Sequence, residues 1–82
     1  MDRDRQRRIR SKLCRELRAR RVAAGIPQEA VARLLGRPQS FVSKYESGAR
    51  RLDLAEIESI CAVLKVDILD VIAAATGGTS EV

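Results

Sequence analysis

Histidine and tryptophan are both absent from this chain, which contains one phenylalanine, one tyrosine and two cysteines. Without histidine, the chain lacks the side chain that most often acts as a general acid or base near neutral pH. Cys14 and Cys61 are 47 residues apart, so the chain lacks the set of four ligands that a structural zinc site needs. There is no glycine-rich phosphate loop, and no serine has a basic partner in a catalytic motif. The sequence therefore predicts no enzyme, no metal site, no cofactor and no small-molecule ligand.

Long hydrophobic segments are also missing from the chain. The longest apolar run, from Val71 to Ala75, is too short to cross a membrane. The charged N-terminus lacks the apolar segment of a signal peptide. Isolated cysteines at apolar helical positions usually act as small core residues in a reducing compartment. We therefore expect a cytoplasmic protein without a membrane partner.

The chain does contain many aliphatic side chains and an uneven distribution of charge. Its 82 residues are enough for one small domain, and 45% of them are hydrophobic. Residues 1–21 hold ten Lys/Arg against three Asp/Glu, whereas residues 54–82 hold one against five. A basic front half is typical of proteins that bind nucleic acid, although a solvated arginine-rich helix surface would have the same composition.

A short motif occurs twice, in residues 25–32 and 36–43, with Gly, Pro, Gln and Val recurring at an offset of eleven residues. Each copy ends a helix at glycine, turns, begins a new helix at a polar residue and buries a valine one turn later. Two helix starts at this spacing are typical of a helix-turn-helix. In a basic chain, this arrangement indicates DNA binding.

The periodicity of apolar residues predicts five helices and no strand, so the fold class is all-α, a compact five-helix bundle. We expect a core-facing first helix from Ile9, with Leu13, Leu17 and Val22 on one stripe. The expected later helices are residues 28–35, 39–47, 54–64 and 68–75. Asp53 with Glu56 forms a predicted capping box, and Asp67 or one of its neighbours is the predicted cap of the last helix. The fourth helix is expected to bury one stripe, consisting of Leu54, Ile57, Ile60, Cys61 and Leu64.

The third expected helix separates its polar and apolar residues onto two faces. At about 100° per residue, Phe41, Val42 and Tyr45 share one face. The opposite face carries Gln39, Ser40, Ser43, Lys44 and Ser47, which can donate and accept hydrogen bonds to bases or phosphates. An ordinary solvated helix face more often mixes Glu with Lys. The absence of acids on this face therefore favours a DNA-reading helix.

Residues 13–75 resemble the lambda-repressor-like, xenobiotic-response-element family of helix-turn-helix regulators. The resemblance rests on Leu17-Arg18, Arg21, residues 25–29 (Gly-Ile-Pro-Gln-Glu), Val31-Ala32, Leu35-Gly36, residues 37–46, Gly48 and Leu52. It implies a DNA-binding domain over residues 9–75 whose third helix lies in the major groove. Residues 1–8 are then either a basic arm that enters the minor groove or a helix extension, and residues 76–82 are expected to form a flexible tail.

The resemblance also implies a role for each matching position. Base-reading residues would be Gln39, Ser40, Ser43 and Lys44. Phosphate-binding residues would be Gln28, Arg37, Ser47, Arg50 and Arg51. Arg21 and Glu46 would form a structural ion pair between the first and third helices. The chain departs from the pattern at Pro27 and Pro38, where many members have a capping Ser, Thr or Asn; losing such a cap costs about 1 kcal/mol.

A single recognition helix reads few base pairs, so we expect a homodimer on double-stranded DNA with half-sites about 10 bp apart. The candidate interface is the apolar set Leu64, Val66, Ile68, Leu69, Val71 and Ile72. Part of this set must close the core, and the alternative is that all of it does. The sequence thus predicts a transcriptional regulator, a repressor, that binds a palindromic operator. The alternative is an antitoxin-type protein-interaction module that also regulates its own gene.

Overall fold

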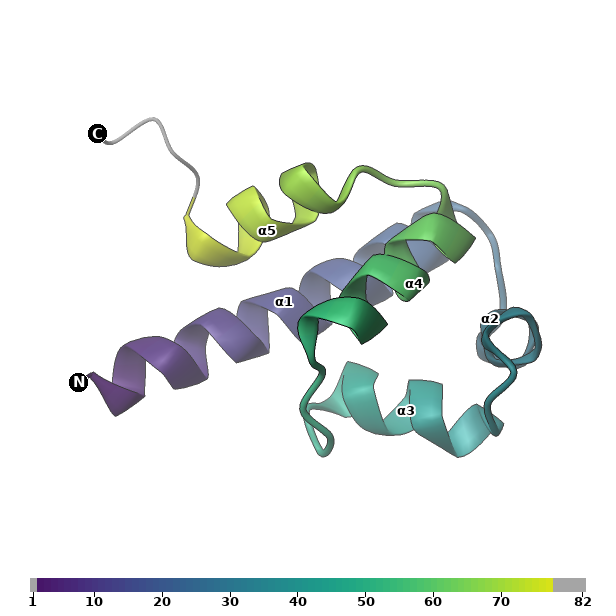
Figure 1. Cartoon of the computed structure of the whole chain (residues 1–82), viewed down its shortest axis with the longest axis horizontal. Helices are drawn as coiled ribbons and strands as arrows, with labels where there is room; N and C mark the ends of the chain where they lie inside the picture. Colours follow the sequence, from purple (N-terminus) through teal and green to yellow (C-terminus); the bar gives the residue numbers. More distant parts are fainter. Residues whose placement is uncertain (1, 78–82) are drawn as a thin grey trace.

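A computed structural model describes residues 2–77 of the chain. The described residues form five helices and no strand: α1 (Arg3–Ala23), α2 (Gln28–Leu35), α3 (Gln39–Ser47), α4 (Leu54–Leu64) and α5 (Ile68–Thr76). The long helix α1 crosses the whole molecule, with α4 and α5 along one part of it and α3 on another (Figure 1). Helix α2 packs against α3 and α4. The predicted all-α class and its five helices are confirmed.

The bounds of α2, α3 and α4 agree with the sequence prediction, because glycine, proline and aspartate mark their ends. Pro27 and Pro38 precede α2 and α3 with nearly the same backbone angles, and neither offers a side-chain cap. Their carbonyl oxygens accept from Ala30 N (3.1 Å) and Phe41 N (3.0 Å), so the repeated motif makes the same turn twice. The capping box of Asp53 and Glu56 is confirmed.

Helix α1 begins six residues earlier than the predicted core-facing segment. Asp2 caps it by accepting a hydrogen bond from Arg5 N (3.0 Å). Residues 3–8 therefore continue α1 towards the N-terminus, with exposed side chains. At the other end of the chain, Asp67 caps α5 as predicted, and α5 includes Thr76. Of the expected flexible tail, residues 78–82 lie outside the described residues.

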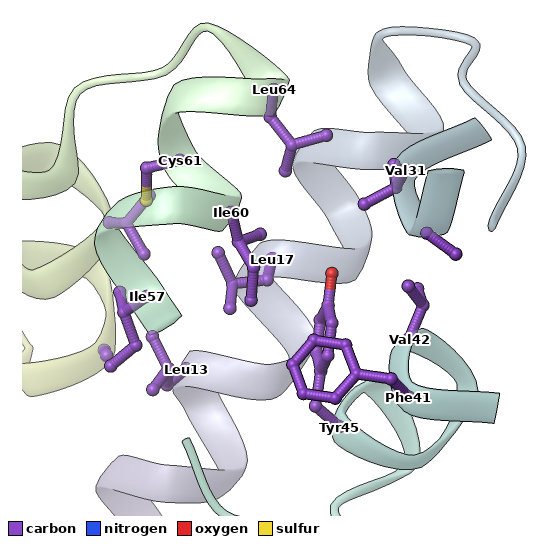
Figure 2. Packing of buried hydrophobic residues seen from close by; sticks show 13 residues of the cluster. Leu13, Leu17, Val31, Phe41, Val42, Tyr45, Ile57, Ile60, Cys61 and Leu64 are labelled. Carbon is purple, nitrogen blue, oxygen red and sulfur yellow. The ribbon is translucent and has the colours of Figure 1, made fainter. Parts of the chain in front are cut away.

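All five helices contribute side chains to the core, which Figure 2 shows from close by. Leu17, Val31, Val42, Ile60 and Val71 are completely buried. The remaining buried residues of the cluster surround them: Leu13, Ala32, Phe41, Tyr45, Ile57, Cys61, Leu64 and Ala75. Val31 and Val42 come from equivalent places in the repeated motif, so the repeat places α2 and α3 on the core in the same way.

Two predicted core positions are wrong. Val22 is 56% exposed, because five residues beyond Leu17 it has turned about 140° away from the buried stripe. Leu54 is 69% exposed, because it is the first residue of α4 and lies one turn before Ile57, the first buried residue of that helix.

Candidate nucleic-acid interface

Helix α3 presents a polar face that is separate from the residues holding it in place. Gln39, Ser40, Ser43, Lys44 and Ser47 are all exposed. On the opposite side of the helix, Phe41, Val42 and Tyr45 point into the core, as Figure 2 shows. The Phe41 and Tyr45 rings pack edge to face, with centroids 5.4 Å apart. The core therefore fixes α3 while leaving its hydrogen-bonding side chains available.

A buried ion pair fastens α3 to α1. Arg21 Nε donates to Glu46 Oε2 (2.6 Å) and Arg21 Nη2 donates to Glu46 Oε1 (3.1 Å), which makes the pair bidentate. Arg21 Nη1 also donates to the Ile26 carbonyl oxygen (2.8 Å), in the loop before α2. The carboxylate raises the pKa of the Arg21 guanidinium. Glu46 is thus neutralised locally, although it lies on the helix that carries the polar face.

Two glutamines extend this pair to the start of the polar face. Gln28 Nε2 donates to Glu46 Oε1 (3.0 Å), and Gln39 Nε2 donates to Gln28 Oε1 (3.4 Å). Because a carboxylate only accepts hydrogen bonds, Glu46 turns the Gln28 amide so that its oxygen faces Gln39. Gln28 and Gln39 are the first residues of α2 and α3, at equivalent places in the repeat. The two helix starts are therefore connected through their side chains.

Arg37 and Arg50, both assigned to phosphate from the sequence, make contacts within the chain. Their guanidinium carbons lie 4.4 Å and 4.7 Å from the centroid of the Phe41 ring, a cation–π distance. Both also donate to the carboxylate of Glu56, at 3.3 Å from Arg37 Nη2 and 3.0 Å from Arg50 Nη1. We call Arg37, Phe41, Arg50 and Glu56 the arginine clamp.

The sequence pointed to Glu56 only as a helix cap, and its contact with the arginines was not foreseen. Arg37 is 19 residues away from it along the chain, so only the folded structure brings them together. Hydrogen bonds from Arg50 and the Asp53 backbone lower the pKa of Glu56 to about 2. A carboxylate so easily ionised keeps its charge, and its hold on both arginines, at neutral pH.

The turn between α2 and α3, the exposed polar face and its buried anchors together form the geometry of a helix-turn-helix. A family model described as a helix-turn-helix domain matches residues 12–75. The chain belongs to this family. No curated protein matches it significantly. Membership supports DNA binding and a part in transcription regulation as the general function of this domain, and it agrees with the resemblance to lambda-repressor-like regulators.

A basic groove lies beside α3 of this helix-turn-helix domain. It has a volume of about 380 Å³ between the N-terminal half of α1 and the loop from α3 to α4. Its rim carries five arginines: Arg7, Arg10, Arg15, Arg50 and Arg51. The exposed Arg51 and Ser47 line the same groove, and the Ser47 hydroxyl donates to the Lys44 carbonyl oxygen (3.0 Å). Positive charge therefore continues beyond the C-terminal end of α3.

The residues expected at a dimer interface divide into two groups. Leu64 and Val71 are 5% and 0% exposed, so they form part of the core of the helix-turn-helix domain and not of the exposed part of the candidate interface. Leu69 is 70% exposed, and Val66, Ile68 and Ile72 are half-buried. The apolar surface left to α5 and the loop before it is thus smaller than the sequence suggested.

Residues 2–77 contain no cluster of three side chains suited to hold a metal ion. Within the same range, no helix has the length and apolarity to cross a membrane.

Proposed function

We propose that this helix-turn-helix protein is a sequence-specific regulator of transcription that binds double-stranded DNA through α3. The observation that carries the proposal is the acid-free exposed face of α3. Glutamine and lysine side chains can each make paired contacts with base edges in the major groove, and serine hydroxyls suit either bases or phosphates. The buried aromatic anchors and the ion pair to α1 hold this face rigid. Rigid placement is what base reading requires, because misplaced donors lose discrimination.

In this proposal, Gln39, Ser40, Ser43 and Lys44 contact bases. The start of α2 and the residues flanking α3 contact the DNA backbone: Gln28, Arg37, Ser47, Arg50 and Arg51. The positive end of the α2 dipole, at Gln28, favours a phosphate there. The basic groove supports phosphate contacts beyond α3, because five arginines line it and the one acid among its lining residues, Glu46, is buried and paired with Arg21.

The proposal includes a homodimer on a palindromic operator, acting as a repressor. One recognition helix reads too few base pairs to select a site in a genome, and a two-fold dimer doubles the contacts. The exposed Leu69, with half-buried Val66, Ile68 and Ile72 around it, is the surface that we assign to the second copy.

The deciding experiment is selection of bound duplexes from a random DNA pool at physiological salt, followed by a reporter assay with the selected site placed over a promoter. We expect an enriched palindrome with half-sites about one helical turn apart, and reduced reporter expression. If no motif is enriched, or if the protein binds all duplexes equally and only in a salt-dependent way, sequence-specific recognition is contradicted. A single half-site without symmetry would contradict the dimer but leave base reading intact.

A further inference from the structure

We propose that Glu56 determines DNA specificity by holding Arg37 and Arg50 back from non-specific contacts and setting their position for the correct site. This inference rests on the proposed function, since it concerns how the same DNA surface discriminates. Glu56 does not belong to α3 and reads no base. It acts through the two arginines and is therefore a positioning residue.

The Glu56 carboxylate links one arginine that precedes α3 to another that follows it. Arg37 lies just before α3 and Arg50 lies just after it. Glu56 Oε2 is 3.3 Å from Arg37 Nη2 and 3.0 Å from Arg50 Nη2, so one oxygen is shared between the two guanidinium groups. The Phe41 ring, from the first turn of α3, contacts both guanidinium groups. The clamp therefore couples the two flanks of α3 to the start of α4.

The clamp restrains the arginines without burying them. Their side chains remain 42% and 37% exposed, whereas the Glu56 side chain is 15% exposed. Arg50 Nη1 also donates to the Arg51 carbonyl oxygen (2.9 Å), which further fixes its direction. A guanidinium has five N–H donors, so each arginine still has donors free to meet a phosphate. Their orientation is set by Glu56 and Phe41 before any DNA arrives.

Charge pairing gives this arrangement a consequence for specificity. Non-specific binding comes almost entirely from cations that neutralise phosphates and release counterions. An arginine already paired with a carboxylate contributes less to non-specific binding, because the carboxylate partly compensates its positive charge. On the correct site, the base contacts of α3 place the flanking phosphates within reach of the N–H groups of Arg37 and Arg50, whose orientation Glu56 has already set. Glu56 thus lowers non-specific affinity more than operator affinity.

The test compares Glu56→Gln with Glu58→Gln in the full chain. The amide introduced by Glu56→Gln keeps a carbonyl oxygen for the Asp53 backbone N–H, so the capping box is retained. Glu58 is exposed on the same helix and forms no ion pair with any residue in the described part of the chain, so its substitution makes the same charge change outside the clamp. Binding is measured on the selected operator and on a scrambled duplex of equal length, over a series of salt concentrations.

We expect Glu56→Gln to bind the scrambled duplex several-fold more tightly, with a salt slope steeper by about one to two units as one or both arginines are released. The ratio of operator to scrambled affinity should fall by roughly an order of magnitude, while Glu58→Gln leaves that ratio unchanged. Equal ratios for wild type and Glu56→Gln would overturn this inference alone. A wild type that shows no preference for the operator would overturn the proposed function as well.

A second comparison does not depend on the folding of a Glu56 variant. Arg50→Gln and Arg51→Gln change neighbouring residues, of which only Arg50 is held by Glu56. Arg51→Gln should reduce the salt slope on scrambled DNA by about one unit, and Arg50→Gln by clearly less. Arg50→Gln should instead weaken operator binding selectively. If both variants reduce the scrambled-DNA slope equally, Arg50 is not held back and the inference is wrong. Circular dichroism of each variant confirms that it is folded.

Discussion

At the scale of single residues, Gln39 and Arg51 differ in how their contacts should depend on DNA sequence. Gln39 begins α3, and its amide is oriented through Gln28 and Glu46. We expect Gln39→Ala to lose about 1–3 kcal/mol of discrimination at one position of each half-site. Arg51→Ala should weaken binding to all sequences and flatten the salt slope. Binding to a set of single-base operator variants measures both, and identical profiles would contradict the two roles.

The pair of Arg21 and Glu46 should matter mainly to folding. Both side chains are nearly buried, at 12% and 3% exposed, so removing Arg21 leaves a carboxylate without its partner. We expect Arg21→Ala to reduce the free energy of unfolding by about 3 kcal/mol, measured by urea denaturation. The double change Arg21→Met with Glu46→Leu should cost less than Arg21→Ala, because no buried charge remains. A double variant that is less stable than Arg21→Ala would contradict this explanation.

Glu56 should give the protein a characteristic response to acid. Its pKa is lowered from the ordinary 4.5 to about 2, so its ionised form stabilises the folded chain above pH 4.5. That contribution is lost as the pH falls from 4.5 towards about 2. Thermal melting across this range should therefore show a smaller decrease in stability for Glu56→Gln than for wild type. Glu58→Gln controls for the loss of a carboxylate in general, and equal profiles for wild type and Glu56→Gln would argue against the clamp.

At the scale of helices, the backbone conformation of the residue that ends each helix leads to a further prediction. Helices α2 and α3 end at glycines with positive φ, whereas α4 ends at Lys65 with φ of 59°. A lysine in this left-handed conformation costs about 1 kcal/mol relative to glycine. We expect Lys65→Gly to stabilise the fold by about 1 kcal/mol and to raise the melting temperature.

Gly36→Ala is the matched change in the opposite direction. A Cβ at Gly36 would meet no atom within 4 Å, so the cost comes from its φ of 69° and not from a clash. We expect a loss of about 1 kcal/mol in unfolding free energy. If Lys65→Gly proves destabilising while Gly36→Ala is neutral, backbone conformation does not determine these helix ends.

Helix bounds could be predicted from the sequence because they depend on local signals. Proline and glycine mark the turn between α2 and α3, and the Asp53–Glu56 capping box marks the start of α4. Which side of a helix is buried depends on its neighbours, and there the prediction was less accurate. Leu54 sits on an apolar stripe but is left largely exposed, whereas Val71 is enclosed by the core.

The candidate site shows the same division. The polar face of α3 follows from helical periodicity, so its residues could be named without a structure. The clamp around Glu56 depends on how the loop after α3 folds back onto α4, which no local pattern encodes. Arg37 and Arg50 were therefore recognised as cations, but the carboxylate that restrains them was not.

At the scale of the whole molecule, the proposed dimer depends on a small apolar surface around Leu69. We expect wild-type protein to associate with increasing concentration in sedimentation equilibrium, and Leu69→Lys to shift that association to higher concentration. Leu34→Lys on α2 is the matched control, because Leu34 is exposed to a similar extent, 67% against 70%. A Leu34 variant that dissociates more readily than the Leu69 variant would place the interface elsewhere.

The separation of anchors from exposed side chains on α3 also bears on how such proteins diversify. Phe41, Val42 and Tyr45 hold the helix, while the exposed residues at positions 39, 40, 43 and 44 contribute little to its packing. Replacements at these four positions should cost little stability, as surface changes usually do. Gene duplication followed by drift at these positions would then produce paralogues with new operators on an unchanged scaffold. DNA specificity could therefore change through the exposed residues of α3, while the buried residues that stabilise the fold stay the same.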